Sequence, residues 1–183
     1  MMVHCQQVFA DSSLHFTPIL SIFFQRFWDT SDQIPSHKCR KSNRLRPEYK
    51  ELVKKAREAK KRSLAPYSNF HVGAALLTAK GKIYTGCNVE ISTYALTICA
   101  ERTAIFKAIS EGDRRFKAIA VVSDDPGYTP PCGSCRQVLM DLAGNIDFLM
   151  INRKGQVEIL KMRDLLPHAF GKKNLQRTKK KRR

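Results

Sequence analysis

The sequence lacks an apolar run long enough to cross a bilayer. The apolar stretch at residues 16–24 is too short for a membrane span and is interrupted by Pro18. No lysine or arginine precedes it and no small-residue cleavage site follows it, so a secretory signal is not expected. Internal repeats are also missing, and 183 residues favour a single domain with its own core.

Acidic residues are scarce: 33 lysines and arginines face 16 aspartates and glutamates, for a net charge of +17. The excess comes from two stretches. Residues 38–62 hold 12 basic and 3 acidic residues, and residues 172–183 hold 8 basic residues and none that is acidic. The remaining chain is close to neutral. A solvated helix surface and a disordered tail are favoured over nucleic-acid contacts as the explanation for these charges.

The chain has too few cysteines for a disulfide scaffold. A body of this size does not need covalent cross-links, and three of the six cysteines fall in motifs that indicate metal binding. These features favour a reducing compartment, and we expect a cytoplasmic protein. Serines, a few arginines and scarce acids in residues 1–45 make a weaker case for an organelle transit peptide.

Two short motifs carry the chemistry. Cys99 and Glu101 form a C-x-E, while Cys132 and Cys135 form a C-x-x-C preceded by proline. Three thiolates can hold one zinc ion and leave its fourth position open, and a nearby carboxylate can move protons to and from water. This is the residue pattern of zinc-dependent base deaminases.

A closed structural zinc site is the alternative. Its fourth ligand would have to be Cys5, Cys39, Cys87 or His71, none of which lies at a usual spacing from the other three cysteines. A structural site would also leave Glu101 unexplained, because a carboxylate beside three thiolates adds repulsion.

Apolar periodicity predicts an α/β fold. A helix is expected over residues 47–63, with strands at 71–79 and 82–87, a helix from about 99 to 112, and a strand at 116–123. A helix at about 133–143, strands at 146–152 and 157–160, and a helical turn near residue 165 complete the order. This order predicts a three-layer α/β/α sandwich around a mixed five-stranded sheet.

The motifs together resemble a known family. Residues 67–75, 86–90, 99–102 and 131–137, in this order, are similar to segments of the small homotetrameric cytidine deaminases. The resemblance extends from about residue 47 to 175. It implies hydrolytic deamination of cytidine and deoxycytidine with one zinc ion per subunit, a role in pyrimidine salvage, and a homotetramer that shares its active sites.

The resemblance also assigns roles to single residues. Glu101 would carry protons between the attacking water, the ring nitrogen N3 and the leaving ammonia. Arg102 would reach back to the ligand sulfurs. The remaining assignments are Phe70 against the pyrimidine, Asn88 and Glu90 at the ribose 3′-hydroxyl, and Tyr94 and Phe170 at a neighbouring subunit's pocket. Considered without the resemblance, Phe70 and Phe170 would be interpreted as core aromatics and Asn88 as a turn residue.

Three other functions compete with a nucleoside deaminase. A nucleic-acid editing deaminase would use the basic stretches, but Glu90 would repel a 3′-phosphate. A blasticidin deaminase fits the pairings of Asn88 with Glu90 and of Glu101 with Arg102 less well, and a non-catalytic RNA-binding module would not need Glu101. The sequence thus predicts a deaminase domain at residues 46–171, between a poorly ordered extension at 1–45 and a basic tail at 172–183.

Overall fold

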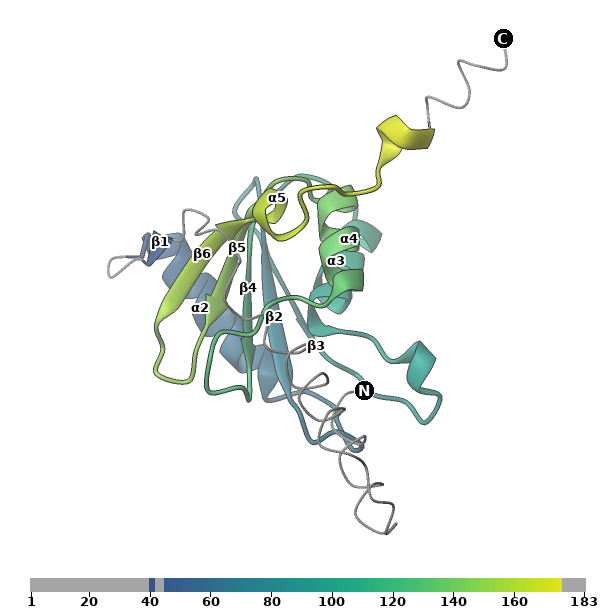
Figure 1. Ribbon diagram of the computed structural model, residues 1–183. Coiled ribbons are helices and arrows are strands. Elements are labelled where there is room, and N and C mark those ends of the chain that lie inside the picture. The colour runs from purple at the N-terminus through teal and green to yellow at the C-terminus, as the bar shows by residue number, and fades with distance from the viewer. Residues whose placement is uncertain (1–39, 42–44, 176–183) are drawn as a thin grey trace, which may run out of the picture. The chain divides into compact units, whose positions relative to one another are not determined.

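One mixed sheet forms the centre of the fold (Figure 1). The structure, a computed structural model, describes residues 40–41 and 45–175. The sheet has the strand order β1-β6-β5-β4-β2-β3. Its central pair, β4 and β5, is parallel, whereas all other neighbouring strands are antiparallel. The strands are β1 (Arg40–Lys41), β2 (Val72–Thr78), β3 (Ile83–Cys87), β4 (Phe116–Ser123), β5 (Asp147–Ile151) and β6 (Val157–Lys161).

Helices cover both faces of this sheet, as the sequence predicted. α2 (Pro47–Lys60) packs on one face, and α3 (Ala100–Ser110) and α4 (Gly133–Leu142) pack on the other. A short α5 (Met162–Leu165) follows β6, and a 3₁₀ turn, η1 (Tyr94–Leu96), lies in the loop before α3. No helix in the described part of the chain is long and apolar enough to cross a membrane.

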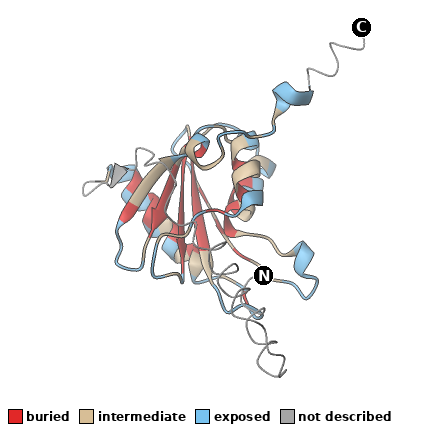
Figure 2. Cartoon of the chain, in the orientation of Figure 1, coloured by how far each residue is buried: buried red, intermediate tan, exposed pale blue. Residues whose placement is uncertain are grey.

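The sheet has a hydrophobic core on each face, because successive side chains of the central strands point to opposite faces. In β4, Ile119 and Val121 are buried beneath α3 and α4, whereas Ala118, Ala120 and Val122 are buried beneath α2. Successive strand residues point to opposite faces, so a strand covered on both sides is apolar throughout. This is why residues 116–123 form a nearly continuous apolar run, and why β2, β4 and β5 are buried along most of their length (Figure 2).

The five longer strands confirm the predicted sheet, and β1 adds a two-residue strand that the sequence did not indicate. β1 pairs with β6 and falls within the segment that we assigned to an extension. Residues 172–175 form a helical turn, although the sequence predicted a disordered tail from 172 onward. The other predictions for residues 1–45 and 172–183 concern positions outside the described residues.

Two glycines allow helices to touch the sheet directly. A Cβ added at Gly86 in β3 would overlap the carbonyl oxygen of Ala100 and lie 2.5 Å from the amide nitrogen of Ala104, both in α3. Gly73 in β2 makes the same kind of contact with the backbone of α2. Both helices therefore lie closer to the sheet than any side chain would permit.

The Gly86 contact can be tested by adding a methyl group. We expect Gly86→Ala to lower the free energy of unfolding by about 1–3 kcal/mol, because the new atom meets backbone that cannot rotate away. Gly171→Ala is the control, since a Cβ there meets no atom within 4 Å. Equal denaturation midpoints for the two variants would contradict the close approach.

Candidate metal and catalytic site

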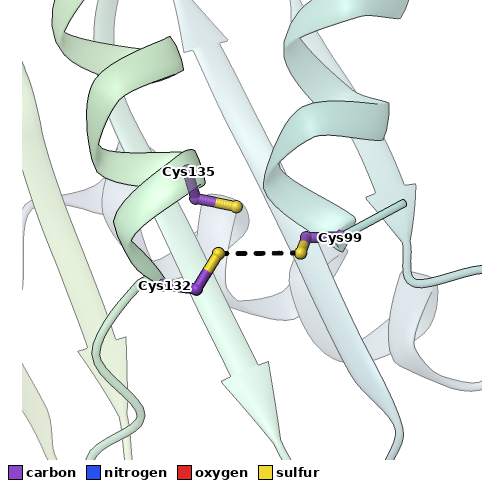
Figure 3. Close-up of side chains that lie close together, drawn as sticks. All are labelled: Cys99, Cys132 and Cys135. Atoms are coloured by element: carbon purple, nitrogen blue, oxygen red, sulfur yellow. Dashed lines mark hydrogen bonds between the residues drawn. The ribbon is translucent and has the colours of Figure 1, made fainter. Parts of the chain in front are cut away.

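The starts of two helices bring three cysteines together (Figure 3). Cys99 directly precedes α3, Cys132 directly precedes α4, and Cys135 lies in the first turn of α4. Cys99 and Cys132 are extended residues whose side chains do not cap their helices, so their sulfur atoms point to a common centre. All three sulfur atoms lie within 4.8 Å of one another, with 3.8 Å between those of Cys99 and Cys132.

The surroundings of Cys99 and Cys135 shift the pKa values of these two thiols in opposite directions. A hydrogen bond from the Cys135 thiol and the nearby Arg102 guanidinium lower the pKa of Cys99 to about 5. The pKa of Cys135 is raised, because its proton is held in that hydrogen bond and its sulfur is buried. Cys99 therefore favours the thiolate form, which is the form that binds metal ions. A zinc ion fits this donor set, since it binds thiolates and accepts a tetrahedral arrangement.

The proposed alternative fourth ligands lie elsewhere. The Cys87 thiol contacts the carbonyl oxygen of Arg62 at 3.3 Å, and the His71 ring contacts Asp124 at 2.8 Å. Among the described residues, only Cys99, Cys132 and Cys135 form a group that could hold a metal ion. Cys5 and Cys39 fall outside the described residues. Within the described residues the cluster offers three ligands, the number that an open zinc site requires.

Arg102 reaches the sulfur atom of Cys99. Its guanidinium donates to the Cys99 sulfur at 3.5 Å and to the Thr97 carbonyl oxygen at 3.0 Å. Its Nε is buried and has no hydrogen-bond partner within the described residues. The guanidinium places positive charge beside the thiolates and offsets part of their negative charge.

Glu101 is buried in the first turn of α3, two residues after Cys99, and only 5% of it is exposed. Burial, with the neighbouring Cys99 thiolate, raises the pKa of Glu101 to about 7. A carboxyl group with such a pKa exists in both protonation states near neutral pH. It can therefore accept and donate a proton in one reaction cycle.

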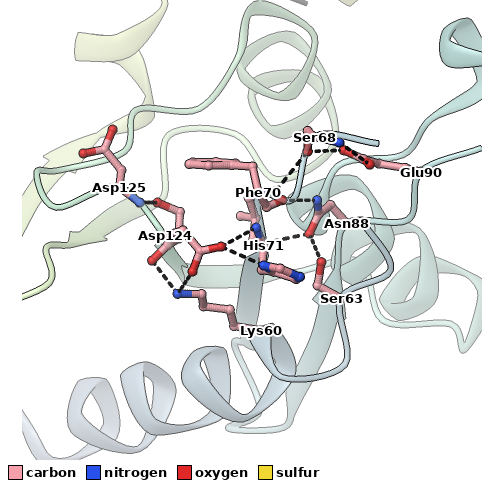
Figure 4. A network of polar contacts seen from close by, with 11 residues as sticks. Lys60, Ser63, Ser68, Phe70, His71, Asn88, Glu90, Asp124 and Asp125 are labelled. Carbon is pink, nitrogen blue, oxygen red and sulfur yellow. Dashed lines mark hydrogen bonds and ion pairs between the residues drawn. The ribbon is translucent and has the colours of Figure 1, made fainter. Parts of the chain in front are cut away.

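Three of the five predicted substrate residues lie in one hydrogen-bonded network (Figure 4). The Asn88 side chain donates to the Phe70 carbonyl oxygen at 2.8 Å. Glu90 accepts from the backbone N–H groups of Tyr67 and Ser68 at 3.0 and 3.1 Å, and also from the Ser68 hydroxyl. Asn88 is 8% exposed and Phe70 is 37% exposed. The structure thus brings Phe70, Asn88 and Glu90 together on adjoining segments.

Tyr94 and Phe170 lie apart from this network on the surface. Tyr94 is 59% exposed and packs edge-on against Tyr67, with ring centroids 5.3 Å apart. Phe170 is 58% exposed, and its carbonyl oxygen accepts a hydrogen bond from Gln137 at 2.7 Å. Neither aromatic ring is buried in the core of its own chain.

Sequence reasoning missed several residues of the network. The Ser63 hydroxyl donates to Asn88, and the Ser68 hydroxyl donates to Glu90. Lys60 forms an ion pair with Asp124. Lys60 was assigned to a solvated helix face, and Asp124 to a loop. The only available signal for Asp124 was its position directly after a buried strand, where sheet edges commonly carry functional side chains.

Comparisons with known proteins agree with this geometry. Residues 46–149 match the family described as "Cytidine and deoxycytidylate deaminase zinc-binding region". The chain is 49% identical over 125 residues to a "Cytidine deaminase" from Sporosarcina psychrophila, covering 68% of this chain and 92% of the relative. A relative with the same name from Halalkalibacterium halodurans is 47% identical over 120 residues, covering 65% of this chain and 91% of the relative.

A solved structure agrees as well. The crystal structure of cytidine deaminase from Burkholderia pseudomallei is 46% identical in sequence and superposes with a TM-score of 0.65. The match covers 67% of this chain and 98% of that one. Sequence, fold and metal-binding residues lead to the same conclusion: the chain belongs to the cytidine and deoxycytidylate deaminase zinc-binding family.

Proposed function

We propose that this protein hydrolyses the 4-amino group of cytidine and deoxycytidine, giving uridine or deoxyuridine and ammonia, as in pyrimidine salvage. The observation that carries the proposal is the cluster of Cys99, Cys132 and Cys135, with Glu101 buried two residues from the first ligand. The relatives' name, cytidine deaminase, supports the substrate class. The free thiols of the described cysteines suit a reducing compartment such as the cytoplasm.

Cys99, Cys132 and Cys135 would hold a zinc ion, which would supply Lewis-acid activation of water. Glu101 accepts a proton from this water and delivers it to N3 of the pyrimidine ring. A C–O bond forms at C4 and gives a hydroxyl group there. Glu101 then takes the proton of this hydroxyl and transfers it to the amino group, so that the C4–N bond breaks, ammonia leaves and C4=O remains, while N3 keeps its proton. Its raised pKa suits both directions of transfer near neutral pH.

The hydrogen-bond capacity of Asn88 and Glu90 matches a single sugar hydroxyl. Asn88 uses its oxygen for Ser63 and the Val72 N–H, and one amide hydrogen for the Phe70 carbonyl, so that one amide hydrogen is left. Glu90 already accepts three hydrogen bonds and has room for about one more. Asn88 would donate to the 3′-hydroxyl oxygen, and Glu90 would accept its hydrogen.

Glu90 also favours a free nucleoside over a polynucleotide. Burial disfavours its ionised form, but hydrogen bonds from Ser68 and Tyr67 outweigh burial and lower its pKa. A carboxylate that remains charged at neutral pH would repel the phosphate of a continuous strand. We therefore assign the catalytic role to residues 46–171 and no substrate role to the basic tail at 172–183.

A homotetramer with shared pockets would cover the exposed aromatic rings. Large exposed apolar groups that gather on one protein commonly mark an interface. The family resemblance implies that Tyr94 and Phe170 lie against a neighbour's pocket, and more than half of each residue is exposed in its own chain. On this proposal, Phe170 completes the pyrimidine site of another subunit.

The metal assignment predicts about one zinc per chain in the purified protein. Cys132→Ala should remove most of this zinc, because two remaining thiolates hold the ion weakly. Cys87→Ala is the control and should retain it, since Cys87 lies outside the cluster. Measurement by atomic emission decides the matter, and full zinc occupancy in Cys132→Ala would refute the ligand set.

Glu101→Gln should separate metal binding from proton transfer. The amide keeps the shape of the side chain but cannot accept the proton, so kcat for cytidine should fall by about 10²–10⁴-fold. Zinc content and the unfolding midpoint should stay near those of the parent protein. Retention of more than about a tenth of kcat would exclude Glu101 as the proton carrier.

Mixed tetramers can test the shared site. Phe170→Ala should lower kcat/KM by about 5- to 150-fold with zinc intact, the range expected for one lost base–aromatic stack. Co-assembly of Glu101→Gln chains with Phe170→Ala chains should restore efficiency above either parent, because some sites then contain both residues. If mass spectrometry confirms mixed tetramers and activity equals only the weighted average, Phe170 serves its own chain.

A further inference from the structure

Asp124 joins two segments that sequence reasoning left unconnected (Figure 4). One carboxylate oxygen, Oδ2, accepts a hydrogen bond from the backbone N–H of His71 at 2.7 Å and lies 2.8 Å from Nδ1 of the same residue. The other, Oδ1, pairs with the Lys60 ammonium at 2.5 Å. Lys60 also donates to the carbonyl oxygen of Ser123 at 2.8 Å, so that α2 holds the end of β4 as well.

The two segments joined by this contact continue to different parts of the site. One carries Phe70, and the other carries the metal ligand Cys132. Asp124 directly follows β4 and begins the loop that ends at Cys132. The base of this loop is held by Ser123, whose hydroxyl contacts Thr129 and accepts from the Asp125 N–H at 3.0 Å. His71 directly follows Phe70. Asp124 therefore fixes the segment that carries Phe70 relative to the loop that carries a metal ligand.

Phe70 needs such an anchor because the core does not hold it. Phe70 is 37% exposed, so core packing alone does not fix its position. The backbone is fixed instead: the Phe70 N–H donates to the Ser68 hydroxyl at 3.0 Å, and its carbonyl oxygen accepts from Asn88. The preceding residue, Asn69, has a positive φ of 53°, a conformation that persists where neighbouring contacts enforce it.

We propose that Asp124 is a positioning residue for the substrate pyrimidine, which it affects by fixing the backbone beneath Phe70 through the His71 N–H. The inference rests on the proposed contact between Phe70 and the ring. Asp124 itself touches no reacting atom. The zinc ligands and Glu101 lie on α3 and α4, so the effect falls on substrate binding rather than on proton transfer.

An ordinary surface ion pair would not have this effect. Lys60 and Asp124 are partly exposed, and such pairs contribute little. A backbone N–H bonded to a carboxylate is stronger and is directional. Burial opposes ionisation of Asp124, but the Lys60 and His71 contacts lower its pKa to about 2, so the carboxylate stays charged at neutral pH.

Steady-state kinetics with cytidine tests the proposal in the full chain. Asp124→Ala is expected to raise KM by about 5- to 20-fold, as for loss of one charge-assisted hydrogen bond, with kcat changed less than about twofold. Asp124→Asn keeps an acceptor for the His71 N–H, so its KM should stay within about threefold of the parent. Zinc content and unfolding midpoints, measured for each variant, identify any loss of fold.

Asp125→Ala is the matched control. It removes the same charge from the same loop. Among the described residues, the Asp125 carboxylate accepts a hydrogen bond only from the Gly127 N–H of that loop, at 2.6 Å. Its KM should remain near the parent value. An equal rise in KM for Asp125→Ala and Asp124→Ala would overturn the proposal, because the loop itself and not the contact with His71 would then be responsible.

A double-mutant cycle with Phe70→Ala completes the test. If Asp124 acts through Phe70, then Asp124→Ala should change KM less than about twofold in the Phe70→Ala background. A full additional rise in that background overturns the inference. A parent-like KM for Phe70→Ala would instead refute the proposed role of Phe70, whereas a raised KM for Phe70→Ala with a silent Asp124→Ala refutes the inference alone.

Discussion

The structure depends on holding three sulfur ligands together although thiolates repel one another. Within the described chain, three features reduce this repulsion: the helix starts at Cys99 and Cys132, whose partial positive charge favours thiolate, and the guanidinium of Arg102. A cation completes the balance. The charge of Cys99 also acts on Glu101. Burial raises the pKa of Glu101, and the neighbouring Cys99 thiolate raises it further. Ligand geometry and proton transfer are therefore two results of one electrostatic arrangement.

Local sequence patterns were sufficient to predict the layers and the metal site. The apolar positions of α2 recur at helical spacing, and the run at 116–123 marked the central strand, because burial imposes these periods directly. Cys99, Cys132 and Cys135 were found because each metal motif is short in sequence. Glu101 and Arg102 lie beside this cluster because they share the first turn of α3, and their roles stay predictions.

Contacts between distant segments were not predictable in the same way. Asn88 is linked to Ser63, Val72 and Phe70, and Asp124 to Lys60 and His71, across separations that no local period encodes. β1 was missed for a related reason, because two residues of edge pairing leave no apolar pattern. Lys60 was assigned to solvent by its helix face, yet it lies at the end of α2 where the helix meets β4. Tertiary placement decided each of these cases.

The hairpin of β2 and β3 carries a glycine contact on each face of the sheet. Gly73 meets the backbone of α2 at Ala56 and Lys60, and Gly86 meets the backbone of α3 at Ala100 and Ala104. Atomic radii fix the separation of two touching backbones, and no change of rotamer can alter it. Lys60 in α2 and Cys99 at the start of α3 lie on opposite faces of the sheet. The distance of each from the sheet is therefore set by contacts with the same two strands. The hairpin thus sets how far α2 and α3 lie from the sheet, whatever rotamers the neighbouring core side chains adopt.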